Sequence, residues 1–241
     1  MITLYQFPIS HYCEKVRWAL DYKNIDYRVK NLLPGLHVKK ARALTGSAEV
    51  PIIKHEKNVI SNSSAIISYI DEVFTDKMLT SADNDIRDAS LEWERFVDNE
   101  IGPNLRVYFY NTLLKHPNIL IPIFAHNGPW YGKHVLKFIF PRLNLAMRRL
   151  MNINDKTANQ ASYNLQKGID KLNNHLQKHS FLAGDSFGRA DLAAASLLAP
   201  IIQPVQYGLI WPDELPDPLQ SSINEWSQQV EWAECLYGNY R

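Results

Sequence analysis

Ser10 and Cys13 are the residues near the start of the chain whose types and spacing could do chemistry. The β-branched and aromatic residues of the run 2–7 predict a strand that ends in a turn. Beyond the turn, Cys13, Val16 and Leu20 return at the spacing of one helix face. Ser10 then stands at the N-cap, where unpaired N–H groups and the helix dipole favour an anion. The segment therefore predicts a small anion site with a hydroxyl and a thiol beside it.

Both residues also have an ordinary structural explanation. Serine is a preferred N-cap whatever the function, so Ser10 taken alone favours simple helix capping. A single cysteine on an apolar helix face is usually a small buried hydrophobe, and we expect Cys13 to pack inward. A chemical role therefore depends on the rest of the chain.

Two later stretches place similar chemistry at strand ends. Val50-Pro51 heads an expected strand, where the missing N–H of proline is tolerated. Residues 59–66 run from another strand directly into a helix start that contains Asn62 and Ser63, both of N-cap type. Taken alone, these two residues also favour plain capping.

Together, Ser-x-x-Cys after the first strand, Val-Pro before the third and Asn-Ser at the third helix resemble the glutathione transferase family. Residues 181–192, FLAGDSFGRADL, are similar to that family's motif at the start of a helix in its second domain. The resemblance spans most of the chain and is weakest between about residues 100 and 155. It implies an α/β thioredoxin-like N-terminal domain followed by an all-α helical C-terminal domain.

The order of the expected elements agrees with this architecture. In residues 1–76, the expected glutathione-binding domain, strands and helices alternate: strand 2–7, helix 11–22, strand 26–30, helix 37–44, a hairpin of 50–54 and 58–60, and helix 63–74. In residues 84–241, the expected substrate-pocket domain, helical periods dominate. The expected helices are a long one from residue 86 perturbed at Gly102-Pro103, 130–153 kinked at Pro141, 158–178, 188–198 and 218–236.

The resemblance implies that Ser10 is the catalytic hydroxyl and that it faces the sulfur of glutathione. A free thiol titrates near pH 8.5, so a hydroxyl donor at a helix N-terminus would stabilise the reactive thiolate. Each pKa unit gained corresponds to about 1.4 kcal/mol. Because serine comes first and Cys13 second, the order departs from the thiol-exchanging classes, and we expect no disulfide chemistry at Ser10.

The other glutathione contacts follow from the same resemblance. Val50, before a Pro51 that we expect to be cis, would offer its backbone to the cysteinyl part. Ser63 would hold the γ-glutamyl carboxylate at a helix N-terminus. Asn62 stands where an acidic residue or Gln is usual, so it keeps an acceptor for the ammonium group and loses the charge. His37 would meet the glycyl carboxylate, or else is an exposed helix residue.

The second domain would supply the pocket for the electrophile. Tyr108 and Trp130 are candidates for that pocket, with Trp93 and Tyr110 beside them, because they are large and lie on its first two helices. Burial in an ordinary core explains each of them as well. Asp191, by contrast, belongs to a predicted capping box that starts at Gly188, and we expect a role in folding.

The segment 130–153 does not fit the family pattern. Its basic residues are interleaved with aromatic ones, and it contains no acidic residue. This composition is typical of a helix that lies on anionic lipid. It also fits a helix packed on the core with a basic outer face, which the kink at Pro141 favours. We therefore expect no membrane-surface contact.

Composition limits the remaining possibilities. The chain has 241 residues, of which 46% are hydrophobic and 21% charged, and its net charge of +1 argues against a nucleic-acid partner. The two cysteines, Cys13 and Cys235, form neither a disulfide framework nor a zinc spacing, so we expect no metal and a reducing compartment. No secretion signal is recognisable at the N-terminus, and a cytoplasmic location is expected.

The leading hypothesis is a homodimeric, detoxifying glutathione transferase, with glutathione as co-substrate. The enzyme would activate the glutathione thiolate for attack on a small hydrophobic electrophile or a peroxide. The alternative is a non-catalytic member of the family that uses the fold to bind a ligand or a protein partner. Neither the electrophile nor the partner can be named from the sequence.

Overall fold

The computed structural model describes residues 1–241 and begins with a four-stranded sheet in the order β2-β1-β3-β4. The strands are β1 (Ile2–Gln6), β2 (Tyr27–Asn31), β3 (Ile52–His55) and β4 (Asn58–Ser61). β1 runs parallel to β2 and antiparallel to β3, and β3 forms an antiparallel hairpin with β4. Leu4 is opposite Val29 on one side and Ile53 on the other.

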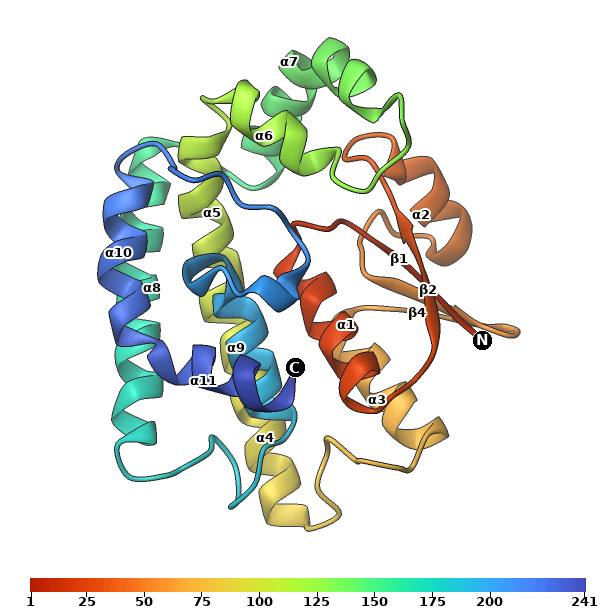
Figure 1. Ribbon diagram of the computed structural model, residues 1–241, viewed down its shortest axis with the longest axis vertical. Helices are drawn as coiled ribbons and strands as arrows, with labels where there is room; N and C mark the ends of the chain where they lie inside the picture. Colours follow the sequence, from red (N-terminus) through yellow and green to blue (C-terminus); the bar gives the residue numbers. More distant parts are fainter.

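Helices cover both faces of this sheet (Figure 1). Because side chains alternate along a strand, Leu4 and Ile53 enter the main hydrophobic core, whereas Tyr5 and Ile52 form a small cluster on the opposite face. The main core contains α1 (His11–Tyr22) and α3 (Ser63–Val73), and the small cluster receives Ala41 of α2 (His37–Thr45). This is the expected thioredoxin-like arrangement.

The remainder of the chain is helical, with no further strand. It comprises α4 (Asn84–Phe96), a π-helical turn (Val97–Ile101), α5 (Gly102–Leu113), α6 (Pro117–Phe124), α7 (Gly132–Leu150), α8 (Asp155–Leu176), α9 (Arg189–Ile202), a 3₁₀ turn (Val205–Tyr207), α10 (Leu219–Gln229) and α11 (Glu231–Tyr240). α9 is buried almost throughout and packs against α1, so one core of 52 residues unites the sheet domain with the helices.

Three helices differ from the sequence expectation. The long helix from residue 86 is interrupted by the π turn at Val97–Ile101, and Pro103 lies in the first turn of α5, where proline is tolerated. The last expected helix is two helices divided at Val230. α6 was not expected as a helix at all, because its apolar residues surround Pro122.

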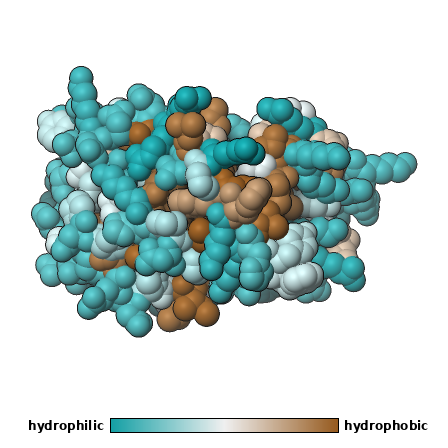
Figure 2. All heavy atoms as spheres, turned by 90° about the horizontal axis from the view of Figure 1, so that it is seen from above, coloured by the Kyte–Doolittle hydropathy of each residue, from teal (hydrophilic) through white to brown (hydrophobic).

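α7 has a buried row and an exposed row. Leu136, Phe140 and Leu143 are buried, as expected for a helix packed on the core. Phe138 is 85% exposed, and Trp130, just before the helix, is 90% exposed. Figure 2 looks onto this end of the molecule and shows hydrophobic residues gathered among hydrophilic ones. The apolar residues of the segment are therefore only partly buried. None of the helices has both the length and the apolar character needed to cross a bilayer.

Candidate active site between the two domains

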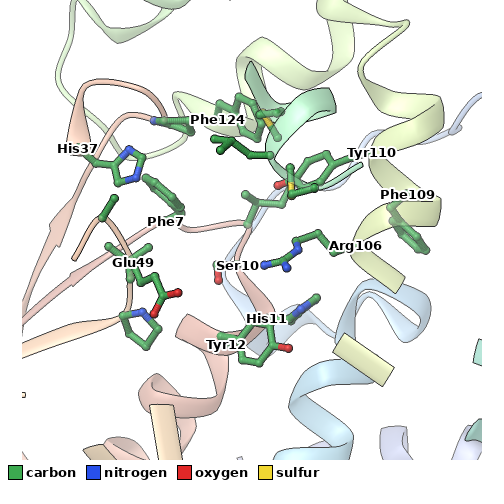
Figure 3. Close-up of a pocket in the computed structure, with 18 of the residues that line it drawn as sticks. Phe7, Ser10, His11, Tyr12, His37, Glu49, Arg106, Phe109, Tyr110 and Phe124 are labelled. Atoms are coloured by element: carbon green, nitrogen blue, oxygen red, sulfur yellow. The ribbon is translucent and has the colours of Figure 1, made fainter. Parts of the chain in front are cut away.

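A cavity of about 700 Å³ opens where the sheet domain meets α5 and α7. All six residues predicted for glutathione line it: Ser10, His37, Val50, Pro51, Asn62 and Ser63. The opposite wall comes from the helical domain and includes Arg106, Tyr110 and Met147. Figure 3 shows Ser10 and His37 on one side of this space and Arg106 and Tyr110 on the other.

Ser10 lies at the N-terminus of α1 as predicted. Its backbone is extended, with φ −76° and ψ 119°, and its Oγ accepts a hydrogen bond of 3.4 Å from the Cys13 N–H. The hydroxyl lines the cavity and accepts from the helix, so its own proton is available to a ligand. α1 thus contributes a hydroxyl donor and the positive end of a helix dipole at the same place.

Cys13 lies one turn further along α1 and is inaccessible. Its side chain is fully buried and is not part of the cavity lining. Burial is the main cause that raises the pKa of its thiol, so the thiol stays protonated at neutral pH. The prediction that Cys13 packs inward is confirmed, and Cys13 has no access to a ligand.

The other predicted contacts surround the start of α3 and the hairpin. The Val50–Pro51 peptide bond is cis, as expected. Ser63 is buried at the first position of α3 and lines the cavity. Asn62 is the N-cap of α3, and its Oδ1 accepts from the N–H groups of Ser64 at 3.0 Å and Ala65 at 3.2 Å. Its oxygen is thus engaged by the helix and is not the free acceptor expected for the ammonium group, and the amide Nδ2 remains for a ligand.

His37 lies at the start of α2 and at the edge of the cavity. The backbone N–H of Gly35 donates to its Nδ1 at 3.1 Å, and the ring of Phe7 packs against it with centroids 4.7 Å apart. Burial lowers the pKa of the imidazole below its ordinary value, so His37 is neutral at pH 7. Because Nδ1 accepts, the proton of the neutral ring is on Nε2, which leaves His37 as an uncharged donor.

The aromatic candidates divide into two groups. Tyr110 lines the cavity, whereas Tyr108 points to the other side of α5, where its hydroxyl lies 2.6 Å from Ser222 Oγ. Trp130 is almost fully exposed and does not line the cavity. Trp93 packs against His175 on α8, with ring centroids 4.9 Å apart. The structure therefore brings only Tyr110 of these four to the predicted site.

His11 and Arg106 are among the cavity residues that the sequence did not single out. His11 follows Ser10, and its pKa is lowered to about 3 by burial and by the neighbouring charge of Arg106. Arg106 lies on α5, one turn before Tyr110, and no sequence motif surrounds it. The only available signal was the helical spacing of Arg106 and Tyr110, which places both on one face.

The fold and the cavity together define a class of protein. A thioredoxin-like domain, with a cis-proline directly before β3, is joined to a helical domain, and a ligand-sized cavity lies between the two. Residues 4–77 match the family model described as the N-terminal domain of glutathione S-transferase. Residues 138–216 match the model of its C-terminal domain. The chain belongs to the glutathione S-transferase family, a family of enzymes, as the motifs predicted.

The individual relatives are distant. The chain is 26% identical to glutathione S-transferase 1 of Dianthus caryophyllus, with 93% of this chain and 86% of the relative covered. It is 25% identical to the tetrachloro-p-hydroquinone reductive dehalogenase of Sphingobium chlorophenolicum, with 83% and 82% covered. Among solved structures, glutathione transferase F7 of Populus trichocarpa has a TM-score of 0.66 at 17% identity and covers 98% of this chain and 93% of its own. These values support the family and the fold, and leave the substrate open.

Proposed function

We propose that this protein binds glutathione in the cavity and activates its thiol for transfer to a small hydrophobic electrophile. The observation that carries the proposal is the position of Ser10. Its hydroxyl stands at the N-terminus of α1 and lines the same cavity as Val50 and Ser63. A hydroxyl donor, a backbone edge and a second helix N-terminus are the groups that a thiol tripeptide with two carboxylates requires.

In the proposed complex, groups of the N-terminal domain hold the cysteinyl part and the two carboxylates of glutathione. The Val50 backbone pairs with the cysteinyl part, and Ser63 donates to the γ-glutamyl carboxylate at the N-terminus of α3. The amide Nδ2 of Asn62 donates to the same carboxylate, because its oxygen already caps α3. His37 donates from Nε2 to the glycyl carboxylate.

The chemistry of the proposed transfer requires only the glutathione sulfur and Ser10. The Ser10 O–H donates to the sulfur and holds it as a thiolate, and the thiol proton passes to solvent. The thiolate then forms a C–S bond with the electrophile, and the leaving group departs with its electron pair. Cys13 takes no part, because its thiol is buried and protonated.

The far end of the cavity suits an apolar electrophile. Phe109, Leu113, Phe124, Met147 and Trp211 line it on the helical side. A ring-sized apolar group placed there would be removed from water while the sulfur stays at Ser10. A peroxide is a second electrophile that the same thiolate would reduce.

We also propose that the protein is a cytoplasmic homodimer with a detoxifying role. Sedimentation velocity measures its oligomeric state.

The proposal is tested by retention on immobilised glutathione, followed by calorimetric titration and a conjugation assay with a panel of neutral aryl halides. We expect retention, a measurable dissociation constant and conjugation above the uncatalysed rate. Retention without conjugation of any electrophile or reduction of any peroxide would identify a non-catalytic member of the family. Absence of glutathione binding would reject the proposal.

A further inference from the structure

Arg106 is a cation without a partner inside the cavity. It is the only Lys or Arg among the residues that line this space. Its Nε is buried and has no hydrogen-bond partner, and none of the ion pairs in the structure includes it. In Figure 3 its guanidinium extends from α5 toward the Ser10 side of the cavity. Arg106 is half-buried, and because a buried N–H of a charged group is costly when it is left unpaired, this arrangement points to an anionic ligand.

Neither acidic residue in the cavity lining neutralises Arg106. Asp98 lines the cavity, but its carboxylate oxygens lie 2.9 and 2.8 Å from Lys15 Nζ, and Oδ2 also accepts from Ser64 Oγ at 2.7 Å. Glu49, the other acid in the lining, is an exposed residue next to Val50 and makes no ion pair with Arg106. The positive charge of Arg106 is therefore uncompensated within the cavity.

Two titratable neighbours of Arg106, His11 and Tyr110, carry no charge at neutral pH. His11 is neutral, since burial and Arg106 lower its pKa to about 3. Burial raises the pKa of Tyr110 to about 12, so its hydroxyl keeps its proton. Tyr110 is four residues after Arg106 on α5, and Figure 3 shows its hydroxyl directed into the cavity. Two donors, one of them cationic, are thus presented from one face of α5.

The surroundings of these donors are apolar. Phe109 and Leu113 follow on α5, and Phe124 and Met147 come from α6 and α7. A ligand here would place an apolar body against these side chains and one anionic group at Arg106. A planar aromatic acid has this distribution of charge, and a guanidinium binds a carboxylate through two parallel hydrogen bonds.

We propose that Arg106, assisted by Tyr110, binds the anionic group of the electrophile, so that the protein selects aromatic electrophiles that carry a carboxylate. The inference rests on the proposed glutathione transfer at the same site. With an aryl chloride, the glutathione thiolate forms the C–S bond, the C–Cl bond breaks and chloride leaves with the electron pair. The carboxylate is unchanged by the reaction and serves only for binding at Arg106.

The first test measures binding and needs no turnover. Dinitrobenzoate and dinitrobenzamide, neither of which has a leaving group, are titrated by calorimetry into the protein saturated with glutathione. We expect the acid to bind roughly 10- to 100-fold more tightly than the amide, and Arg106→Met to remove this preference. Arg106→Lys, which keeps the charge, should retain part of it. Arg142→Met, which removes an exposed charge from α7, is the matched control and should bind like the wild type.

The outcomes of this test are separate from those of the proposed function. Equal binding of acid and amide to the wild type would overturn the inference even if conjugation is observed, and so would a preference that survives in Arg106→Met. A preference that depends on Arg106 supports the anion site even if no conjugation is found. Circular dichroism verifies that each variant is folded. If a variant is not folded, the comparison of acid and amide binding to the wild type still tests the inference.

The second test measures transfer. Chlorodinitrobenzoate, with chlorine para to the carboxylate, is compared with the corresponding amide, and each rate is divided by its uncatalysed rate with glutathione. We expect Arg106→Met to lower kcat/KM for the acid roughly 10- to 100-fold, mainly through KM, and to leave the amide within about twofold. An equal loss for both electrophiles would assign Arg106 to the glutathione sulfur and overturn the inference.

Discussion

The Nζ of Lys15, fully buried on α1, lies 2.9 and 2.8 Å from the two carboxylate oxygens of Asp98. The same Nζ lies 2.8 Å from Glu94 Oε1, and Glu94 Oε2 accepts from Arg189 Nε at 2.7 Å. Two cations and two carboxylates thus form one buried network between α1, α4, the π turn and α9. The network holds α1, whose N-cap is Ser10, against the helical domain. It also pairs Asp98 with Lys15, so this carboxylate does not neutralise Arg106.

Removing the central cation of this network should destabilise the protein. Lys15→Met leaves Asp98 and Glu94 without their shared partner, and an uncompensated buried charge costs about 3–5 kcal/mol. We expect a loss of that size in the free energy of unfolding, measured by urea denaturation. Lys115→Met is the control, because the Lys115–Asp155 pair is exposed and worth less than about 1 kcal/mol. Similar small losses for both variants would contradict the structural role of the network.

The start of α3 is the expected binding place of the γ-glutamyl carboxylate. Ser63→Ala removes a hydroxyl that lines the cavity, and a hydrogen bond to a charged group is worth about 1.5–3 kcal/mol. We expect the dissociation constant of glutathione to rise roughly 10- to 100-fold in a calorimetric titration. Ser221→Ala, which loses an exposed hydroxyl on α10, should bind like the wild type. Unchanged affinity in Ser63→Ala would remove Ser63 from the site.

Ser10 and Cys13 should differ sharply in their effect on the reaction. Ser10→Ala removes the donor to the thiolate, so conjugation at neutral pH should slow by roughly 10- to 100-fold. Cys13→Ala should leave the rate near the wild-type value and lower only the stability, since Cys13 is buried away from the cavity. Initial rates with a neutral aryl halide distinguish the two. An essential Cys13 with a dispensable Ser10 would indicate thiol exchange.

The N-terminal half of the candidate site could be predicted because its motifs, which lie at element boundaries, resemble those of the glutathione transferase family. Ser10, Val50, Asn62 and Ser63 each stand where a strand ends or a helix begins, and turn and cap residues mark those boundaries in the sequence. The strands and helices of residues 2–74 could be predicted because their hydrophobic periodicity is strong. The break at Val230 could not be predicted, because the amphipathic period continues through it.

The helical half of the site depends on tertiary packing and could not be predicted. Tyr108 and Tyr110 have similar sequence surroundings, and two residues along a helix separate them by about 200°. Only the packing of α5 against α8 decides that Tyr110 lines the cavity and Tyr108 meets Ser222. A single arginine on a helix usually faces water, so Arg106 carried no signal of its own.

His11 should make the stability of the protein sensitive to acid. Its pKa is lowered from 6.5 to about 3 in the folded state, so below pH 6.5 the unfolded chain binds a proton that the folded chain does not. Stability should therefore fall as the pH drops, by about 2–3 kcal/mol at pH 4.5 from this group alone. His11→Gln should lose correspondingly less stability than the wild type between pH 7 and 4.5, measured by urea denaturation. Parallel losses would contradict the neutral state of His11.

The ionisation of bound glutathione tests the central claim most directly. The protein saturated with glutathione is titrated with base, and the ultraviolet absorbance of the thiolate is followed. For the wild type we expect a thiol pKa about two units below the free value of about 8.5, because the Ser10 hydroxyl and the N-terminus of α1 both stabilise the anion. In Ser10→Ala the pKa should return most of the way to the free value. A bound thiol that titrates like free glutathione in the wild type, or equally in both proteins, would contradict the account.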